Sequence, residues 1–433
     1  MKNAPRTLCM APWTHTYLSP QTERRLCCAS REPAQNFRQY IDTAAGTNEY
    51  LPQTLDEWWN GEHIRRVRRQ MLAGELPPEC EVCDKKLLNT DVYRDYFWHL
   101  FKHKYDDIAR TTDDTGYTSM QPVSWDYRFT NLCNFKCRMC GPMLSSSWEA
   151  EASMDGKIEP WMETPVKQAI EKFQKDTVEQ EFACAVEEHR VEEIYWVGGE
   201  PLMYEQHWRY MQRIIELGDG PNVYARYNTN LSLVNFNSCN LFSDILQNIR
   251  DWQICASLDG VGEVGEYIRT GLNYNKFIDN FKQGLKHSKH RRQMRLDFTL
   301  TTPGLGQILK IQELANELNV DLLVKVCFAF TPDIAMSPLF LPKQELHAII
   351  NRVLPLTNGA MHDVLVNLLN RPTFAEEYPD TYQEARRKAK KRMDLYDSRR
   401  SGLKFIDTLR IGNDPWVYGK LKQWWASIDT SSS

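Results

Sequence analysis

The sequence predicts an α/β fold: a partial (β/α)6 TIM-like barrel with a small cysteine-rich N-terminal domain and a mainly helical C-terminal extension. Three observations lead to this prediction. Strand-like and helix-like segments alternate six times between residues 121 and 330, which is typical of a parallel sheet covered by helices. Eight of the 12 cysteines lie in the first 140 residues. Residues 331–433 begin with a proline-rich loop and continue with helical patterns.

The first 90 residues are predicted to form a domain of their own. They are rich in aromatic residues and in loops, and they hold five cysteines. One helical stretch, residues 55–72, stands out among them. Residues 91–120 are expected to link this domain to the barrel.

The barrel is predicted from strands with helices between them. The strands are residues 124–132, 191–199, 223–230, 252–260, 294–302 and 321–330. The helices are residues 166–190, 207–218, 275–288 and 308–318. Because only six units are found, an open partial barrel suits the chain better than a closed eightfold one.

Charge and hydropathy exclude several classes of protein. Lys and Arg number 53 and Asp and Glu 57, so the net charge of −4 gives no overall attraction to nucleic acid or to an anionic membrane. No apolar stretch approaches the ~18 residues that a membrane span needs. The first residues lack the apolar segment of a secretory signal. We therefore expect a cytoplasmic protein without a membrane or nucleic-acid partner.

Four polar or glycine-rich motifs follow the first four predicted strands. They are a cysteine loop, then Gly-Gly-Glu-Pro, Asn-Thr-Asn and Ser-Leu-Asp-Gly. The carboxyl ends of parallel strands meet at one edge of the sheet, and that edge carries the ligand site in α/β folds. The sequence therefore predicts an active site at this edge.

The cysteine loop has the spacing C-x3-C-x2-C, formed by Cys133, Cys137 and Cys140. Three thiolates on so short a loop can hold a compact iron–sulfur cubane and leave one metal with an open coordination position. A three-cysteine zinc site and cysteines without any metal are the alternatives.

These residues resemble the radical S-adenosylmethionine (radical SAM) superfamily, whose C-x3-C-x2-C loop follows the first strand of a partial barrel. The resemblance implies that Cys133, Cys137 and Cys140 ligate a 4Fe-4S cluster whose open iron chelates SAM. It also implies reductive cleavage of SAM to methionine and a 5′-deoxyadenosyl radical, which abstracts hydrogen from a substrate. A flavodoxin or ferredoxin is the implied reductase. The family often has an aromatic residue where this chain has Met139, an apolar thioether able to pack against adenine.

The resemblance also implies which residues contact SAM. The family's GGEP motif, which meets the methionine amino group, is matched by Gly198, Gly199, Glu200 and Pro201. Glycines allow close approach of the backbone, and a carboxylate suits an ammonium group. The other implied contacts are Asn228, Asn230, Ser257 and Arg269. Each of these motifs alone is also compatible with an ordinary turn.

The N-terminal cysteines form a second set. Cys80 and Cys83 make a CxxC pair, and Cys9 and Cys27 complete four thiolates, with Cys28 as the alternative to Cys27. Four cysteines suit either a structural zinc ion or a fully ligated iron–sulfur cluster. The arrangement resembles the auxiliary modules called SPASM or twitch domains, which implies an auxiliary 4Fe-4S cluster. Those modules normally follow the barrel, whereas this one precedes it.

The function predicted is therefore that of a radical SAM enzyme, an oxidoreductase or peptide-modifying enzyme that acts on a peptide or protein side chain. Oxidation or rearrangement of a small molecule, sugar or nucleotide is the alternative reaction. A zinc-stabilised binding protein is the alternative from another class. It gives no reason for C-x3-C-x2-C and GGEP to lie one βα unit apart.

Overall fold

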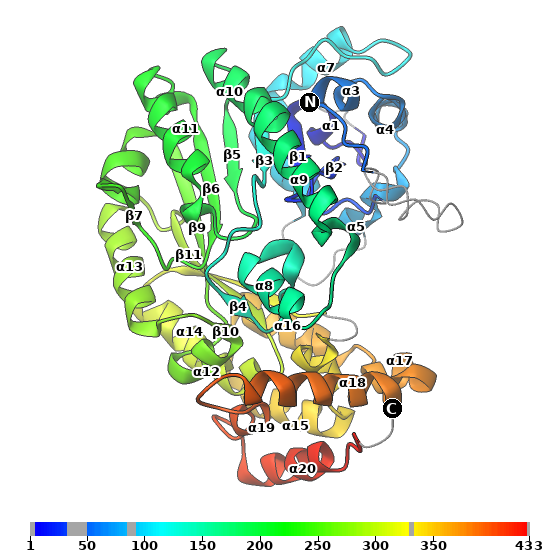
Figure 1. Cartoon of the computed structure of the whole chain (residues 1–433), viewed down its shortest axis with the longest axis vertical. Helices are drawn as coiled ribbons and strands as arrows, with labels where there is room; N and C mark the ends of the chain where they lie inside the picture. The colour runs from blue at the N-terminus through cyan, green and yellow to red at the C-terminus, as the bar shows by residue number, and fades with distance from the viewer. Residues whose placement is uncertain (1–4, 33–49, 85–91, 329–332, 431–433) are drawn as a thin grey trace.

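The computed structural model describes residues 5–32, 50–84, 92–328 and 333–430, and its centre is an eight-stranded sheet (Figure 1). The strand order is β12-β11-β9-β6-β5-β3-β1-β2. The first six are β12 (Asp321–Val326), β11 (Met294–Leu300), β9 (Asp251–Ser257), β6 (Tyr224–Thr229), β5 (Glu193–Trp196) and β3 (Ser124–Tyr127). They are parallel and match the six predicted strands, which confirms the α/β partial barrel. Residues 329 and 330 of the last predicted strand lie outside the described residues.

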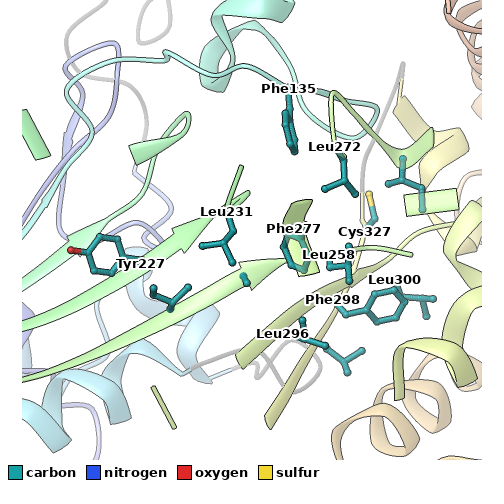
Figure 2. Packing of buried hydrophobic residues seen from close by; sticks show 14 of the residues in the cluster. Phe135, Tyr227, Leu231, Leu258, Leu272, Phe277, Leu296, Phe298, Leu300 and Cys327 are labelled. Carbon is teal, nitrogen blue, oxygen red and sulfur yellow. The ribbon is translucent and has the colours of Figure 1, made fainter. Parts of the chain in front are cut away.

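Burial explains why these segments are strands. Their apolar side chains are almost completely covered, as expected for parallel strands with helices outside them. Fully buried examples are Trp125, Tyr227, Ile254 and Phe298. Figure 2 shows part of this core, in which Leu258, Leu296, Phe298 and Leu300 pack together with Phe135 of the cysteine loop and with Leu272. The core therefore reaches up to the loop that carries the predicted cluster ligands.

The N-terminal region contributes to the same sheet. β1 (His15–Leu18) pairs in parallel with β3, and β2 (Arg24–Arg25) pairs antiparallel with β1 at the sheet edge. His15 Nδ1 lies 2.7 Å from Ser124 Oγ across the β1–β3 pair. The cysteine-rich region is thus joined to the barrel by main-chain pairing, although it also has a buried cluster of its own.

The helices of the N-terminal region lie beside the β1 end of the sheet (Figure 1). They are α1 (Ala11–Thr14), α3 (Leu55–Trp59), α4 (Glu62–Leu72), α5 (Glu81–Asp84), α6 (Tyr93–Phe101) and α7 (Tyr105–Thr111). The helical stretch predicted over residues 55–72 is split between α3 and α4. The chain turns at Gly61, where a Cβ would lie only 2.7 Å from the carbonyl oxygen of Glu57.

Helices cover the barrel as predicted. They are α8 (Ser146–Met154), α9 (Thr164–Phe173), α10 (Glu179–Glu187), α11 (Glu205–Glu216), α12 (Gly262–Ile268), α13 (Tyr274–His287) and α14 (Ile308–Glu317). A π-helical turn, Gln174–Val178, joins α9 to α10, so the long helix predicted over residues 166–190 is nearly continuous. Two small antiparallel pairs complete the barrel: β4 (Lys136–Cys137) with β10 (Arg269–Thr270), and β7 (Asn235–Phe236) with β8 (Cys239–Asn240).

The C-terminal extension is mainly helical, as predicted. Its helices are α15 (Lys343–Val353), α16 (Gly359–Leu369), α17 (Phe374–Glu377), α18 (Pro379–Ser398), α19 (Phe405–Thr408) and α20 (Pro415–Ala426). Gly306 and Gly412 bring it against the barrel, because a Cβ on Gly412 would lie 2.0 Å from the carbonyl oxygen of Gly306. Across the described ranges, no helix has both the length and the apolar character to cross a membrane.

Candidate active site

The three cysteines of the C-x3-C-x2-C motif lie on one loop after β3, and the start of α8 holds this loop. Ser147 donates through Oγ to the carbonyl oxygen of Cys133 at 2.8 Å. Trp148 donates through Nε1 to the carbonyl oxygen of Cys137 at 2.9 Å. These bonds fix the main chain on which Cys133, Cys137 and Cys140 are carried.

The thiols of this loop are mutually close and half-buried. Burial and, to a smaller extent, the charges of Glu200 and Cys140 together raise the pKa of the Cys133 thiol to about 12. Burial also raises the pKa of Cys137, while the charge of Arg269 opposes the shift. All described cysteines are free thiols. A cation bound by the sulfurs would favour their thiolate forms.

The donor set suits an iron–sulfur cubane. A 4Fe-4S cluster takes one cysteine on each of three irons, so its ligands lie further apart than the ligands of a single ion. Within the part of the chain that the structure describes, no three His, Cys, Asp or Glu side chains converge on a single-ion site. Three neighbouring thiols, beside the guanidinium group of Arg269, fit the predicted cluster.

Arg269 is held beside this loop by a partner that sequence reasoning gave little weight. Its Nε lies 2.7 Å from Oδ2 of the fully buried Asp259, and its Nη1 lies 3.9 Å from Cys137 Sγ. Asp259 also accepts from the main-chain N–H of Thr299 at 2.9 Å. Burial raises the pKa of Asp259, and the charge of Arg269 lowers it. Asp259 thus orients a positive charge towards Cys137.

The Gly-Gly-Glu-Pro loop lies directly against the cysteine loop. The main-chain N–H of Glu200 donates to the carbonyl oxygen of Leu132 at 2.8 Å. A Cβ on Gly199 would lie 2.3 Å from the same oxygen, so only glycine allows this approach. Gly198 has a φ of +130°, another position that favours glycine. Tyr204 braces the loop, since its hydroxyl accepts from Gly199 N at 2.6 Å.

Glu200 links this loop to the end of β6. Its carboxylate accepts from Thr229 Oγ1 at 2.5 Å and from the N–H groups of Asn230 at 2.7 Å and Leu202 at 3.2 Å. Burial raises the pKa of Glu200 to about 7, and these bonds oppose the shift. Asn230 in turn donates through Nδ2 to Asn134 of the cysteine loop at 2.9 Å. Thr229, the middle residue of Asn-Thr-Asn, was missed although its position in the motif could have indicated it.

Asn228 and Ser257 lie on strands β6 and β9 themselves, not on the loops that follow the strands. Asn228 accepts from the Tyr195 hydroxyl at 3.0 Å and donates to Asp297 at 2.8 Å. Asp297 also pairs with Lys325 at 2.8 Å. Ser257 is half-buried and lies opposite Asp297 in the β9–β11 register. The structure therefore brings Asn228 into a polar network between the strands, and no described bond joins it to the cysteine or Gly-Gly-Glu-Pro loops.

Arg138, inside the cysteine motif, was not predicted from the sequence. It is almost fully buried, and its Nη1 lies 2.8 Å from Asp397 of α18. Its Nε donates to the Tyr267 carbonyl oxygen at 3.0 Å, and its guanidinium stacks 3.7 Å from the centre of the Tyr267 ring. Its neighbour Met139 lines a cavity of about 670 Å³ between the cysteine loop, α8 and α18. The C-terminal extension thus supports the cysteine loop.

The N-terminal cysteines also gather. Cys9, Cys27 and Cys80 are buried in one apolar cluster. Burial raises the pKa of Cys27, and the charges of Cys28, Cys9 and Cys80 add to the shift, as expected for neighbouring thiols. Burial also raises the pKa of Cys9, and the charge of Cys83 contributes to that shift.

Cys28 faces a different environment from these four. Its pKa is raised to about 11, because burial and the charge of Asp126 outweigh the opposing effects of the Arg128 charge and a bond with Tyr93. Asp126 lies on β3 and Arg128 directly follows it, whereas Tyr93 lies on α6. The charges of Cys9 and Cys80 act on Cys27.

Comparison with known proteins gives one family match. Residues 127–320 match the model of the family described as Radical SAM superfamily. No curated protein matches the chain significantly. The distant similarity to solved structures includes Streptococcus suis SuiB bound to S-adenosylmethionine, at 14% identity and a TM-score of 0.34, covering 61% of this chain and 59% of that chain.

Two further structures are similar at the same low level. SuiB bound to its precursor peptide SuiA is 13% identical, with a TM-score of 0.36, and the match covers 77% of this chain and 72% of that chain. Native anSMEcpe with bound AdoMet and Cp18Cys peptide is 14% identical, with a TM-score of 0.26, and the match covers 50% of each chain. The chain thus spans less than two thirds of SAM-bound SuiB and half of anSMEcpe. No inference about function follows from scores this low.

Proposed function

Residues 127–320 are a radical SAM domain, and on that premise we propose that the protein cleaves SAM reductively and modifies a substrate by hydrogen abstraction. The family uses a 4Fe-4S cluster and SAM. When bound, the cluster supplies the electron that breaks the sulfonium bond of SAM. The observation that carries the proposal is the contact of the cysteine loop with Gly-Gly-Glu-Pro, where Glu200 N lies 2.8 Å from the Leu132 oxygen.

The chain's own residues would bind and orient these groups. Cys133, Cys137 and Cys140 would hold the cluster. Arg269, fixed by Asp259, places a positive charge 3.9 Å from Cys137 Sγ and offsets the negative charge that the thiolates bring. Met139 offers an apolar surface beside the third cysteine.

The remaining predicted contacts would bind SAM itself. The Gly-Gly-Glu-Pro loop would accept its methionine amino group, because Gly199 lets the loop pack against the cysteine loop and Glu200 carries a buried carboxylate there. Asn230, bonded to both loops, would help to shape this end of the site. Pro201, Asn228, Ser257 and Arg269 stay predicted contacts of SAM.

The proposal is tested with the Cys137→Ala variant and anaerobic protein reduced by dithionite. We expect wild type to convert SAM to 5′-deoxyadenosine and the variant to form none, measured by liquid chromatography. Cys184→Ala is the matched control, because Cys184 is exposed on α10 and remote from both cysteine sets. Undiminished product from Cys137→Ala would refute the assignment.

We further propose an auxiliary iron–sulfur cluster, 4Fe-4S, on Cys9, Cys27, Cys80 and Cys83, within a twitch-like domain of residues 1–90 followed by a linker of residues 91–120. The mutual effect of these thiols on one another's pKa supports it. Cys27→Ala is expected to lower the iron content, whereas Cys28→Ala leaves it unchanged. The opposite result would assign the ligand to Cys28, and zinc in place of iron would overturn the cluster.

The substrate class we propose is a peptide or protein side chain, processed in the cytoplasm with a flavodoxin or ferredoxin as reductant. SuiB was solved with its precursor peptide SuiA, and anSMEcpe with the Cp18Cys peptide. A peptide encoded beside the gene provides the test. With reduced enzyme and SAM, its mass is expected to change, and its tandem mass spectrum identifies the altered side chain. Conversion of a small molecule without any change in peptides would contradict the proposal.

A further inference from the structure

An arginine-lined cavity of about 760 Å³ opens at the amino ends of β6, β9 and β11. The arginines are Arg226, Arg250, Arg291, Arg292 and Arg295, and His99 and His290 stand among them. Asp251 is the one carboxylate among the described lining residues. Because the whole chain carries a net charge of −4, this positive charge is a local concentration rather than a general property.

The cavity has a fixed basic floor. The guanidinium of Arg226 lies between the rings of Tyr96 and Tyr195, 4.9 and 4.8 Å from their centres. Arg295 donates through Nε to Cys255 Sγ at 3.0 Å. These contacts hold two positive charges at the base of the cavity.

The rim is exposed, and two of its four basic side chains are paired with carboxylates. Arg291 pairs with Asp321 at 2.9 Å, and His290 lies 3.1 Å from Asp251. Arg250 and Arg292 are exposed, and within the described ranges neither forms an ion pair. Exposed arginines that form no ion pair within the protein can bind an acidic partner without first breaking an existing ion pair.

The cavity is at the opposite end of the strands from the predicted SAM site. The motif loops leave the carboxyl ends, whereas the cavity is formed by the first residues of the same strands. Strands of six or seven residues separate the two by roughly 20 Å. A ligand bound in the cavity is therefore remote from the reacting groups.

Helix α6 connects this cavity to the N-terminal cysteines. Its Tyr96, His99 and Leu100 line the cavity. Its Phe97 and Phe101 are buried in the cluster that contains Cys9, Cys27 and Cys80. The thickness of one helix, about 10 Å, thus separates the basic cavity from the cysteine cluster.

We propose that the cavity is the docking surface for an acidic electron-donor protein of the flavodoxin class, which delivers electrons through the N-terminal cysteine site. The inference rests on the proposed function, because reductive cleavage of SAM consumes an electron that the chain itself cannot supply. In each transfer the donor's flavin hydroquinone is oxidised to its semiquinone and the enzyme is reduced by one electron. The positive cavity attracts the acidic donor and orients it towards α6.

The test reverses the two unpaired charges at the rim. Holoenzyme carrying Arg250→Glu and Arg292→Glu is compared with wild type in two measurements: the Kd for a flavodoxin, and the rate of 5′-deoxyadenosine formation with either dithionite or the reduced flavodoxin. Arg352→Glu with Arg410→Glu is the matched control, because both residues are exposed arginines of the C-terminal extension. We expect the rim variant to bind flavodoxin about tenfold or more weakly at low salt. Its dithionite-driven rate should remain that of wild type.

Several outcomes would overturn the inference. They are an unchanged Kd, an equal loss in the control variant, a loss of the dithionite-driven rate as well, or a wild type that responds to dithionite but not to flavodoxin. Unchanged flavodoxin binding together with weaker binding of an oligoglutamate peptide would assign the cavity to an acidic peptide instead. If wild type forms no 5′-deoxyadenosine even with dithionite, the proposed function itself fails, which separates the two results.

Discussion

Glu193 and Glu200 stand at the two ends of the β5 region, and burial raises the pKa of each to about 7. Glu200 is held by Thr229 and two main-chain N–H groups beside the cysteine loop. Glu193 accepts instead from Ser124 and, at 2.8 Å, from the Tyr96 hydroxyl. One carboxyl therefore belongs to the predicted active site, and the other ties α6 to the amino end of the sheet.

Glu193 makes the stability of the fold depend on pH. Its ordinary pKa of 4.5 rises to about 7 in the fold, so the folded state binds more protons between these values. The free energy of unfolding should fall as the pH rises through that window. Glu193→Gln removes this dependence, so its free energy of unfolding relative to that of wild type should rise by about 2.5 kcal/mol from about pH 5 to about pH 8. Urea unfolding at the two pH values measures it, and a difference that does not change with pH would be evidence against the buried carboxyl.

At the scale of elements, the candidate active site is formed by contacts between the loops that follow different strands. The strands and most helices could be predicted because alternation and helical periodicity are local properties of the sequence. The break at Gly61 was not predicted, because the segment around it remains helical in pattern. The pairing of β1 with β3 and the bond between Asn230 and Asn134 were not predicted either. Both depend on which distant segments meet, and a single sequence does not specify that.

The approach of the Gly-Gly-Glu-Pro loop to the cysteine loop gives a sharp prediction. Gly199→Ala places a Cβ 2.3 Å from the Leu132 oxygen, so the two loops must separate. We expect SAM to bind at least about tenfold more weakly, which corresponds to about 1.4 kcal/mol. Gly141→Ala, in the facing cysteine loop, is the control, because a Cβ there meets nothing within 4 Å. Equal SAM affinities in equilibrium dialysis for the two variants would contradict the proposed contact.

At the scale of the whole molecule, both terminal regions support the barrel. The N-terminal region extends its sheet through β1, and the C-terminal extension reaches the cysteine loop through Asp397 and Arg138. The sequence predicted the extension as helical, but Arg138 and Asp397 are far apart along the chain and carry no shared motif. The mainly helical extension could therefore be predicted, whereas its contact with the site could not.

The ion pair of Asp397 with Arg138 should stabilise both the whole fold and the cysteine loop. Asp397→Asn leaves the buried Arg138 without its charge partner, which is expected to cost about 3 kcal/mol or more. We expect a lower Tm and faster loss of iron from the loop. Asp394→Asn on the same helix breaks a pair with Lys390 in which the carboxylate is exposed, so it should change stability by about 0.5 kcal/mol or less. Thermal unfolding with iron analysis compares them, and equal behaviour would argue against this role for α18.

The most direct test of the central claim is the metal content of anaerobically prepared protein. The account predicts about eight irons and about eight sulfides per chain, one cubane at each cysteine set. It predicts about four of each in Cys137→Ala, because only the N-terminal cysteines then hold a cluster. Zinc without iron in wild type, or an iron content that Cys137→Ala leaves unchanged, would contradict it.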